Sequence, residues 1–193
     1  QADVNCELAP TVATLNPFPV TFSGEPCMDW PAIDARVESG QYSQNFADLS
    51  NGVEAQAGNE VHVVIYVHNG AAVNLDPDLT TARNVRVVTT IDQNSNGEHF
   101  IRTTFRGDNT NTVSGSIRIK TNPGETLEII PGSGEKYNWF ANLEQSGLSI
   151  GNTTFVMGDM DPCFEFSKFL KFRIRVQPVP TPFPTPTPNP TPP

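Results

Sequence analysis

The sequence has little positive charge, no long apolar stretch and no recognisable catalytic motif. Lysine and arginine together number 12 in 193 residues, against 21 aspartates and glutamates, so the formal net charge is −9. Binding to phosphate backbones needs clustered basic residues, so nucleic acid is not expected as a partner. No apolar run approaches the ~20 residues of a membrane-spanning helix. We therefore expect no membrane insertion of the mature chain.

Motifs of enzyme chemistry are also missing. The sequence contains no GxSxG, HExxH, CxxC or glycine-rich phosphate loop. Its histidines, His62, His68 and His99, form no metal or triad spacing. We expect His62 and His68 to share the solvated face of one strand with Tyr66. The chain is therefore not predicted to be an enzyme, and no cofactor is expected apart from one candidate calcium site.

That candidate is the run D-Q-N-S-N-G at residues 92–97. It matches the first half of a calcium-binding loop, in which oxygens at alternate positions and a glycine at the sixth position curl around the ion. The twelfth position holds Thr103 where such loops have a bidentate glutamate. Asn, Ser and Gly are also typical of a β-turn. Both interpretations stay open: calcium at Asp92, Asn94 and Asn96, or a plain turn.

Apolar and polar residues alternate most regularly in residues 60–68 and 81–91. A period of two is typical of a strand with one buried face. Other short stretches follow at intervals of roughly ten residues, bounded by Gly, Asn or Pro, as in all-β sandwiches. They are residues 32–38, 99–106, 112–120, 126–130, 136–143, 148–157 and 164–176. In the last, Lys168 is out of phase, which predicts a β-bulge near Ser167. The predicted fold class is all-β, an antiparallel β-sandwich over residues 27–177.

Residues 1–26 form a separate segment, an extended N-terminal arm. Its prolines exclude a helix and a central strand, yet it is too apolar for a disordered tail. Two interpretations remain: the arm lies on its own domain, or it pairs with the sheet edge of a neighbouring subunit by strand addition. The candidate assembly residues in the arm are Val12, Leu15, Phe18, Val20 and Phe22.

Residues 178–193 contain half of the 18 prolines in the chain. Such a Thr/Pro-rich tail is predicted to be a polyproline II helix, about 3.1 Å per residue and roughly 50 Å in all, outside the core. Pro178, Pro180 and Phe183 are candidate assembly residues. Threonines between prolines are typical acceptors of O-linked glycans, which would make the protein a glycoprotein. They are Thr181, Thr185, Thr187 and Thr191.

The loops and the cysteines indicate an exported protein. The chain begins at Gln1 in a polar segment, and its loops are rich in Asn, Gly, Ser and Thr, which predicts an extracellular, cell-surface location. Three cysteines without metal spacing predict a disulfide. Two pairings are open: Cys27 with Cys163, which ties the start of the domain to its last strand, and Cys6 with Cys27. The third thiol is then free or bonded to another subunit.

Several runs resemble a known family. V-x-I-x-V-x-N-G at residues 63–70 and T-A-R-N-V-R-V at 81–87 resemble the conserved repeat domain of unknown function in large bacterial envelope proteins. CMDWPAIDAR at 27–36, LEIIPGS at 127–133 and MGDMDPCFEF at 157–166 are similar to single-copy surface proteins of candidate-phyla bacteria, which often end in a Thr/Pro-rich stretch.

The resemblance covers about residues 27–176 and implies an Ig-like sandwich that serves as an exposed structural or adhesive module. It implies no activity. The cysteines that flank the domain recur in that group, which favours the pairing of Cys27 with Cys163. Cys6 is then the free or intersubunit cysteine.

Two functions follow as expectations. The first is an extracellular structural protein, a self-assembling subunit of a surface filament or surface layer whose partners are copies of itself, joined through the extended ends. The alternative is a stalked adhesin or carbohydrate-binding module. In that case Trp30, Trp139 and Tyr137 would form a platform for glycans, unless these rings pack in the core.

Overall fold

The computed structural model describes residues 9–18, 29–38 and 52–180, and the regular secondary structure in this part of the chain is almost all β-strand. Its elements are β1 (Ile33–Val37), β2 (Val53–Glu54), β3 (Glu60–Val67), α1 (Pro77–Thr80), β4 (Ala82–Asp92), β5 (Glu98–Arg106), β6 (Thr112–Lys120), β7 (Thr126–Ile129), β8 (Gly134–Asn138), β9 (Leu143–Leu148), β10 (Thr154–Met160), the 3-10 turn η1 (Phe164–Phe166) and β11 (Lys168–Gln177).

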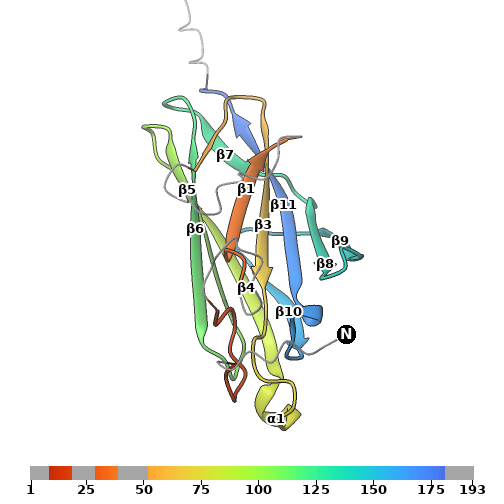
Figure 1. Ribbon diagram of the computed structural model, residues 1–193. Coiled ribbons are helices and arrows are strands. Elements are labelled where there is room, and N and C mark those ends of the chain that lie inside the picture. Colours follow the sequence, from red (N-terminus) through yellow and green to blue (C-terminus); the bar gives the residue numbers. More distant parts are fainter. Residues whose placement is uncertain (1–8, 19–28, 39–51, 181–193) are drawn as a thin grey trace, which may run out of the picture.

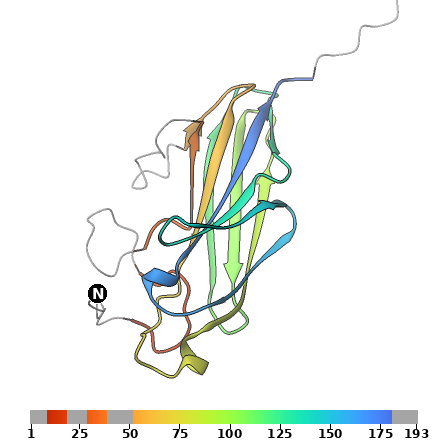
Figure 2. The same cartoon turned by 90° about the vertical axis from the view of Figure 1, so that its right-hand side faces the viewer.

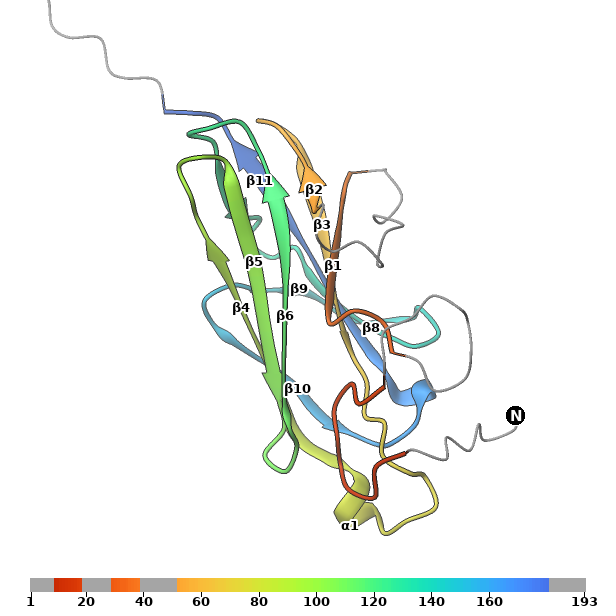
Figure 3. The same cartoon turned by 60° about the vertical axis from the view of Figure 1, so that its left-hand side comes forward.

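The strands form two sheets that face each other (Figures 1 and 3). The first sheet has the order β1-β3-β11-β8-β9, with β7 also paired to β11. The second has the order β10-β4-β5-β6-β2, in which only the short pairing of β2 with β6 is parallel. The fold is thus the all-β sandwich that the alternating pattern predicts.

The core lies between the sheets because the alternating residues of both sheets point inward. In β3 the side chains of Val61, Val63, Ile65 and Val67 are fully buried. β4 buries Val85, Val87 and Thr89 against them from the opposite sheet, as expected. Burying one such apolar side chain stabilises the fold by about 1.5–3 kcal/mol, so this alternation fixes which face of each strand is inside.

β11 is the central strand of the first sheet. It pairs with β3 along one edge and with both β7 and β8 along the other. Leu170, Phe172, Ile174 and Val176 are buried at alternate positions, as predicted. The strand begins only at Lys168, because Phe164–Phe166 forms a 3-10 turn. The predicted bulge near Ser167 is wrong, since the turn itself accounts for the change of phase.

Two further strand boundaries differ from the prediction. Residues 136–143 are not one strand, because Asn138 Oδ1 accepts from Asn142 N at 3.0 Å in a tight turn between β8 and β9. Ala141 adopts a positive φ of 60° in that turn. Residues 148–157 are also divided, since β9 ends at Leu148 and β10 begins at Thr154.

Residues 9–18 of the N-terminal arm lie on the arm's own domain. Leu15 forms a β-bridge with Asn69 and is fully buried, and Phe18 is 9% exposed. Neither side chain is therefore available to a neighbouring subunit, which corrects the assembly role expected for them. Val12 remains 51% exposed. Val20 and Phe22 lie outside the described residues.

The two ends of the sandwich differ. α1 and the described part of the arm lie at one end, and β11 runs away from them to Gln177 at the other (Figures 1 and 2). Pro178, Val179 and Pro180 continue outward and are exposed. The start of the Thr/Pro-rich tail therefore lies outside the core, and the assembly role of Pro178 and Pro180 stays a prediction.

Candidate functional site: an aromatic surface on the first sheet

The outer face of the first sheet is covered by aromatic rings near the start of β11. Tyr66 and His68, predicted to be solvated, are each only 1% exposed, so that prediction is wrong. Phe18 from the arm, Phe164 from η1 and Phe169 from β11 cover them. A second, smaller apolar cluster therefore lies on the side of the sheet that faces away from the main core.

His68 is held by a carboxylate and by two rings. Asp29 Oδ1 lies 2.7 Å from His68 Nδ1, and Asp29 Oδ2 accepts from the backbone N of Phe18 at 2.8 Å. The imidazole stacks on Phe164 with centroids 4.1 Å apart. Its Nε2 is buried and has no hydrogen-bond partner in the described part of the chain. Asp29 is a site residue that the sequence analysis missed.

Tyr66 belongs to the same cluster. Its hydroxyl lies 3.4 Å from Ser167 Oγ, which is also buried. Burial raises the pKa of Tyr66, and the nearby Asp29 adds to the effect. The phenol is therefore neutral and acts as a structural hydrogen-bonding group.

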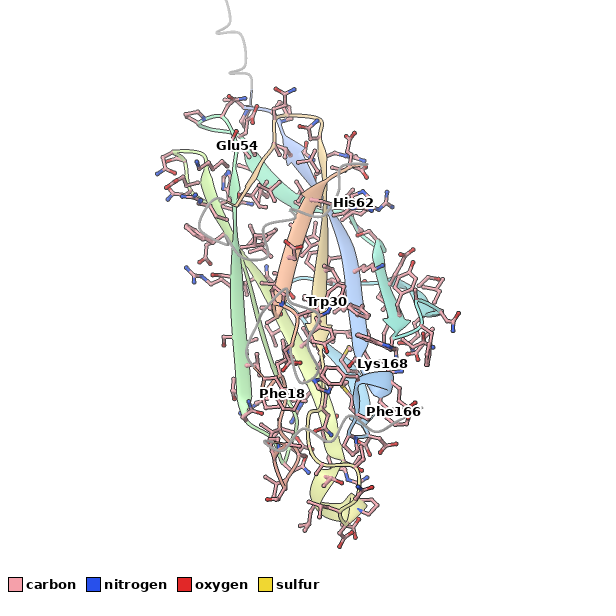
Figure 4. All side chains as sticks on the ribbon, viewed as in Figure 1. Phe18, Trp30, Glu54, His62, Phe166 and Lys168 are labelled. Carbon is pink, nitrogen blue, oxygen red and sulfur yellow. The ribbon has the colours of Figure 1, made fainter. Side chains whose placement is uncertain are left out.

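Above this cluster lies a partly exposed group of three rings, Trp30, Trp139 and Phe169, which we call the aromatic surface. The Phe169 ring is between the two indoles: its centroid is 5.8 Å from Trp30, edge to face, and 6.1 Å from Trp139, nearly parallel. Trp30 is 47% exposed. Figure 4 shows Trp30 and Phe18 over the lower half of the first sheet, with His62 nearer its upper end.

Strand register explains why these rings meet. Phe169 is opposite Tyr66 of β3 and opposite Tyr137 of β8, so three aromatic residues form one row across the sheet. Trp139 directly follows β8, and Trp30 precedes β1. The platform predicted from Trp30 and Trp139 is thus brought together, whereas Tyr137 lies beneath Lys171, whose Nζ is 4.3 Å from its ring centroid.

A polar groove continues along the same face. Arg36, His62 and Arg173 lie opposite one another in β1, β3 and β11, and with Lys171 and Glu135 they line the groove. Burial lowers the pKa of Lys171, and burial together with Arg36 and Arg173 lowers the pKa of His62. Glu60 bonds both Arg173 and Arg175, which partly neutralises this row.

A second groove lies beside α1. Its apolar lining comes from Val73, Leu75, Pro77 and Phe166, and Phe166 is 41% exposed. Asp161 and Glu165 line it as well. The lining of this groove is therefore mixed, part apolar and part acidic, unlike the aromatic surface.

The candidate calcium residues form the turn between β4 and β5. The Asp92 carboxylate pairs with Arg102, and Asn96 Oδ1 accepts from Glu98 N at 2.9 Å. The carbonyl of Asn94 accepts from the N–H of Gly97, whose φ is +85°. Each residue thus has a role in the turn, and calcium binding stays a prediction.

Some predicted residues lie beyond the described ranges. These are Cys6, Cys27, Thr181, Phe183, Thr185, Thr187 and Thr191. Cys163 is half-buried with φ of 111° and is not in a disulfide with another described residue. The pairing of Cys27 with Cys163 therefore stays a prediction, as do the sites of O-glycosylation.

No helix in the described ranges is both long and apolar enough to cross a membrane. Comparisons with protein-family models, with curated proteins and with solved structures find no match to this chain. The resemblance to bacterial surface repeats therefore stays a prediction.

Proposed function

We propose that this protein is an extracellular structural subunit that assembles with copies of itself into a surface filament or layer. One observation carries the proposal: the Thr/Pro-rich tail begins after Gln177 at one end of the sandwich, while α1 and the described arm, which expose Leu79 and Val12, lie at the other end (Figure 1). Contacts between such different ends are heterologous, and they generate open filaments when the rotation does not close.

The composition supports the same function. The described core is a β-sandwich, which we assign to the Ig-like class of surface modules, and the tail has no charged side chain. The described strands hold no set of three His, Cys, Asp or Glu side chains placed to bind a metal ion.

The test is the state of the full chain in solution. We expect electron microscopy of unreduced protein to show regular filaments or sheets whose repeat is close to one domain length. A variant in which the tail prolines are replaced, such as Pro180→Gly with Pro182→Gly and Pro184→Gly, should remain monomeric at the same concentration. A wild-type chain that stays monomeric at all concentrations would contradict the proposal.

The second candidate function is a carbohydrate-binding module, and the arrangement of Trp30, Phe169 and Trp139 favours it. Partly exposed indoles on a sheet face present a large apolar area with little loss of side-chain entropy on binding. We expect neutral oligosaccharides to quench tryptophan fluorescence in that case. If oligosaccharides do not change the tryptophan fluorescence and the wild-type chain forms filaments, assembly is the function and carbohydrate binding is excluded.

A further inference from the structure

We propose that the aromatic surface formed by Trp30, Trp139 and Phe169 binds the polyproline tail, residues 178–193, of a second copy of the chain. This inference rests on the proposed function and names the contact by which the subunits join. The site is on the outer face of the first sheet, and its ligand is an uncharged, proline-rich segment.

The chemistry of the two surfaces fits. Proline-rich segments dock on grooves lined by aromatic side chains, because their preformed polyproline II helix loses little entropy on binding. The tail offers proline at nearly every second position, with Val179 and Phe183 as larger apolar groups. The partner surface offers two indoles on either side of Phe169, with Trp30 about half exposed.

Geometry favours the tail of another copy. Phe169 is the second residue of β11 and Gln177 is its last, so roughly 27 Å of strand separates the aromatic surface from the start of the tail. Pro178 to Pro180 continue away from the sheet (Figure 2). To reach its own aromatic surface the tail would have to reverse its direction, which a stiff polyproline II segment resists. The tail of a second copy needs no reversal.

Length and charge agree with this arrangement. As the polyproline II helix expected from the sequence, residues 178–193 would span roughly 50 Å, enough to leave one sandwich and lie across another. Two chains of net charge −9 repel each other, and a tail without charged side chains can bridge them at a distance. The groove beside α1 is less suitable, since Asp161 and Glu165 line it and it exposes one aromatic ring, Phe166.

The chain contains its own reporter of this contact. Its two tryptophans are Trp30 and Trp139, both in the aromatic surface, and the tail contains neither tryptophan nor tyrosine. A synthetic peptide of residues 178–193 can therefore be titrated into the full chain, at concentrations below those of assembly, while tryptophan fluorescence is followed. We expect a saturable change, and the same peptide with glycine in place of its prolines should produce none.

Variants locate the binding. Trp30→Ala should weaken peptide binding at least tenfold, and Trp30→Phe should weaken it less because a ring remains. Phe140→Ala is the matched control, since Phe140 is 66% exposed in the turn after β8 but is not part of the aromatic surface. It should bind the peptide as the wild type does. At protein concentrations at which the chain assembles, the free peptide should occupy the aromatic surface and so lower the mean mass of the polymer.

Three results would overturn the inference. One is a polymer that forms equally well with Trp30→Ala and is insensitive to the peptide, which would leave the proposed function standing with a different contact. Another is an effect of the tail on the tryptophan fluorescence of its own chain that is independent of protein concentration. The tail of each monomer would then lie on the aromatic surface of the same chain. The third is a tryptophan fluorescence that changes with oligosaccharides but does not change with the peptide. Peptide binding by a chain that never polymerises would instead contradict the proposed function alone.

Discussion

Asp29 Oδ1 lies 2.7 Å from His68 Nδ1, and both side chains are 1% exposed. The contact joins the segment before β1 to the residue after β3 and positions the imidazole against Phe164. It is therefore the polar centre of the cluster that supports the aromatic surface. Removing one member of a buried pair leaves the other without its partner, which costs more than the pair contributes when intact.

We expect Asp29→Ala to lower the free energy of unfolding by about 3 kcal/mol. The substitution removes the acceptor of both His68 and the backbone N–H of Phe18. Urea denaturation followed by circular dichroism measures the effect, and Glu165→Ala, an exposed acid nearby, is the control. A double-mutant cycle with His68→Ala should show coupling between the two sites. Additive effects would mean that the pair does not act as a unit.

His99 should make the protein less stable as the pH falls from 7 to 5. Burial lowers the pKa of His99 despite the opposing effect of Glu125, and Nδ1 accepts from Asn94 N, which needs an unprotonated nitrogen. In this pH range the unfolded chain therefore binds more protons than the folded chain. The stability that neutral His99 contributes is fully present above its unfolded pKa of about 6.5, and it is lost as the pH falls through the lower pKa of the folded state.

The check is urea denaturation at several pH values. His99→Asn should flatten the slope of unfolding free energy against pH in this window, whatever its effect at pH 7. His62, whose pKa is also lowered, supplies a remaining slope of the same sign. Glu60→Gln is the control because the pKa of Glu60 is lowered, chiefly by the hydrogen bond from Arg175. Glu60→Gln should change stability by a nearly constant amount between pH 7 and 5 and should alter the slope only below the normal range of glutamate. An unchanged slope in His99→Asn would disprove the assignment.

A disulfide between Cys27 and Cys163 is expected from the packing that follows each cysteine. Asp29, two residues after Cys27, and Phe164, one residue after Cys163, both contact the ring of His68. Peptide mapping of unreduced protein should find the two cysteines linked. Cys163→Ser should cost about 2–5 kcal/mol of stability, whereas Cys6→Ser should leave folding unchanged and remove any covalent link between subunits. A Cys6–Cys27 peptide would refute the pairing.

Salt should strengthen assembly. The copies carry a net charge of −9 each, and the tail has no charged side chain to form ion pairs. Raising the ionic strength from 0.05 to ~0.5 M shortens the Debye length and screens the repulsion. Light scattering should then show a larger mean mass. A decrease would indicate that ion pairs between the copies hold them together.

The core was predictable because its signal is local. The alternation at Val61, Val63 and Ile65 determines which face of β3 is buried, and the same holds for β11 from Leu170 to Val176. Boundaries were harder to predict. The turn that divides residues 136–143 is held by hydrogen bonds of the Asn138 side chain and backbone, and the alternation of apolar and polar residues does not reveal such bonds.

The candidate site was predictable only in part. Trp30 and Trp139 were candidates for a glycan platform, with packing in the core as the other interpretation, but their common neighbour Phe169 was not among the candidates. Tyr66 and His68 were misplaced because alternation describes one sheet and its core. It contains no information about which distant segments, here Asp29 and Phe164, cover the other face.

The position of β11 determines how the domain would bear a pulling force if tails join the copies. A pull on the tail enters the domain at Gln177 and acts along a strand that is hydrogen-bonded on both edges, to β3 and to β7 and β8. Because antiparallel ladder bonds are perpendicular to the strands, such a force loads them together in shear instead of opening them one after another. The tension then reaches the aromatic surface at the start of the same strand, so a single segment would transmit the load across each subunit.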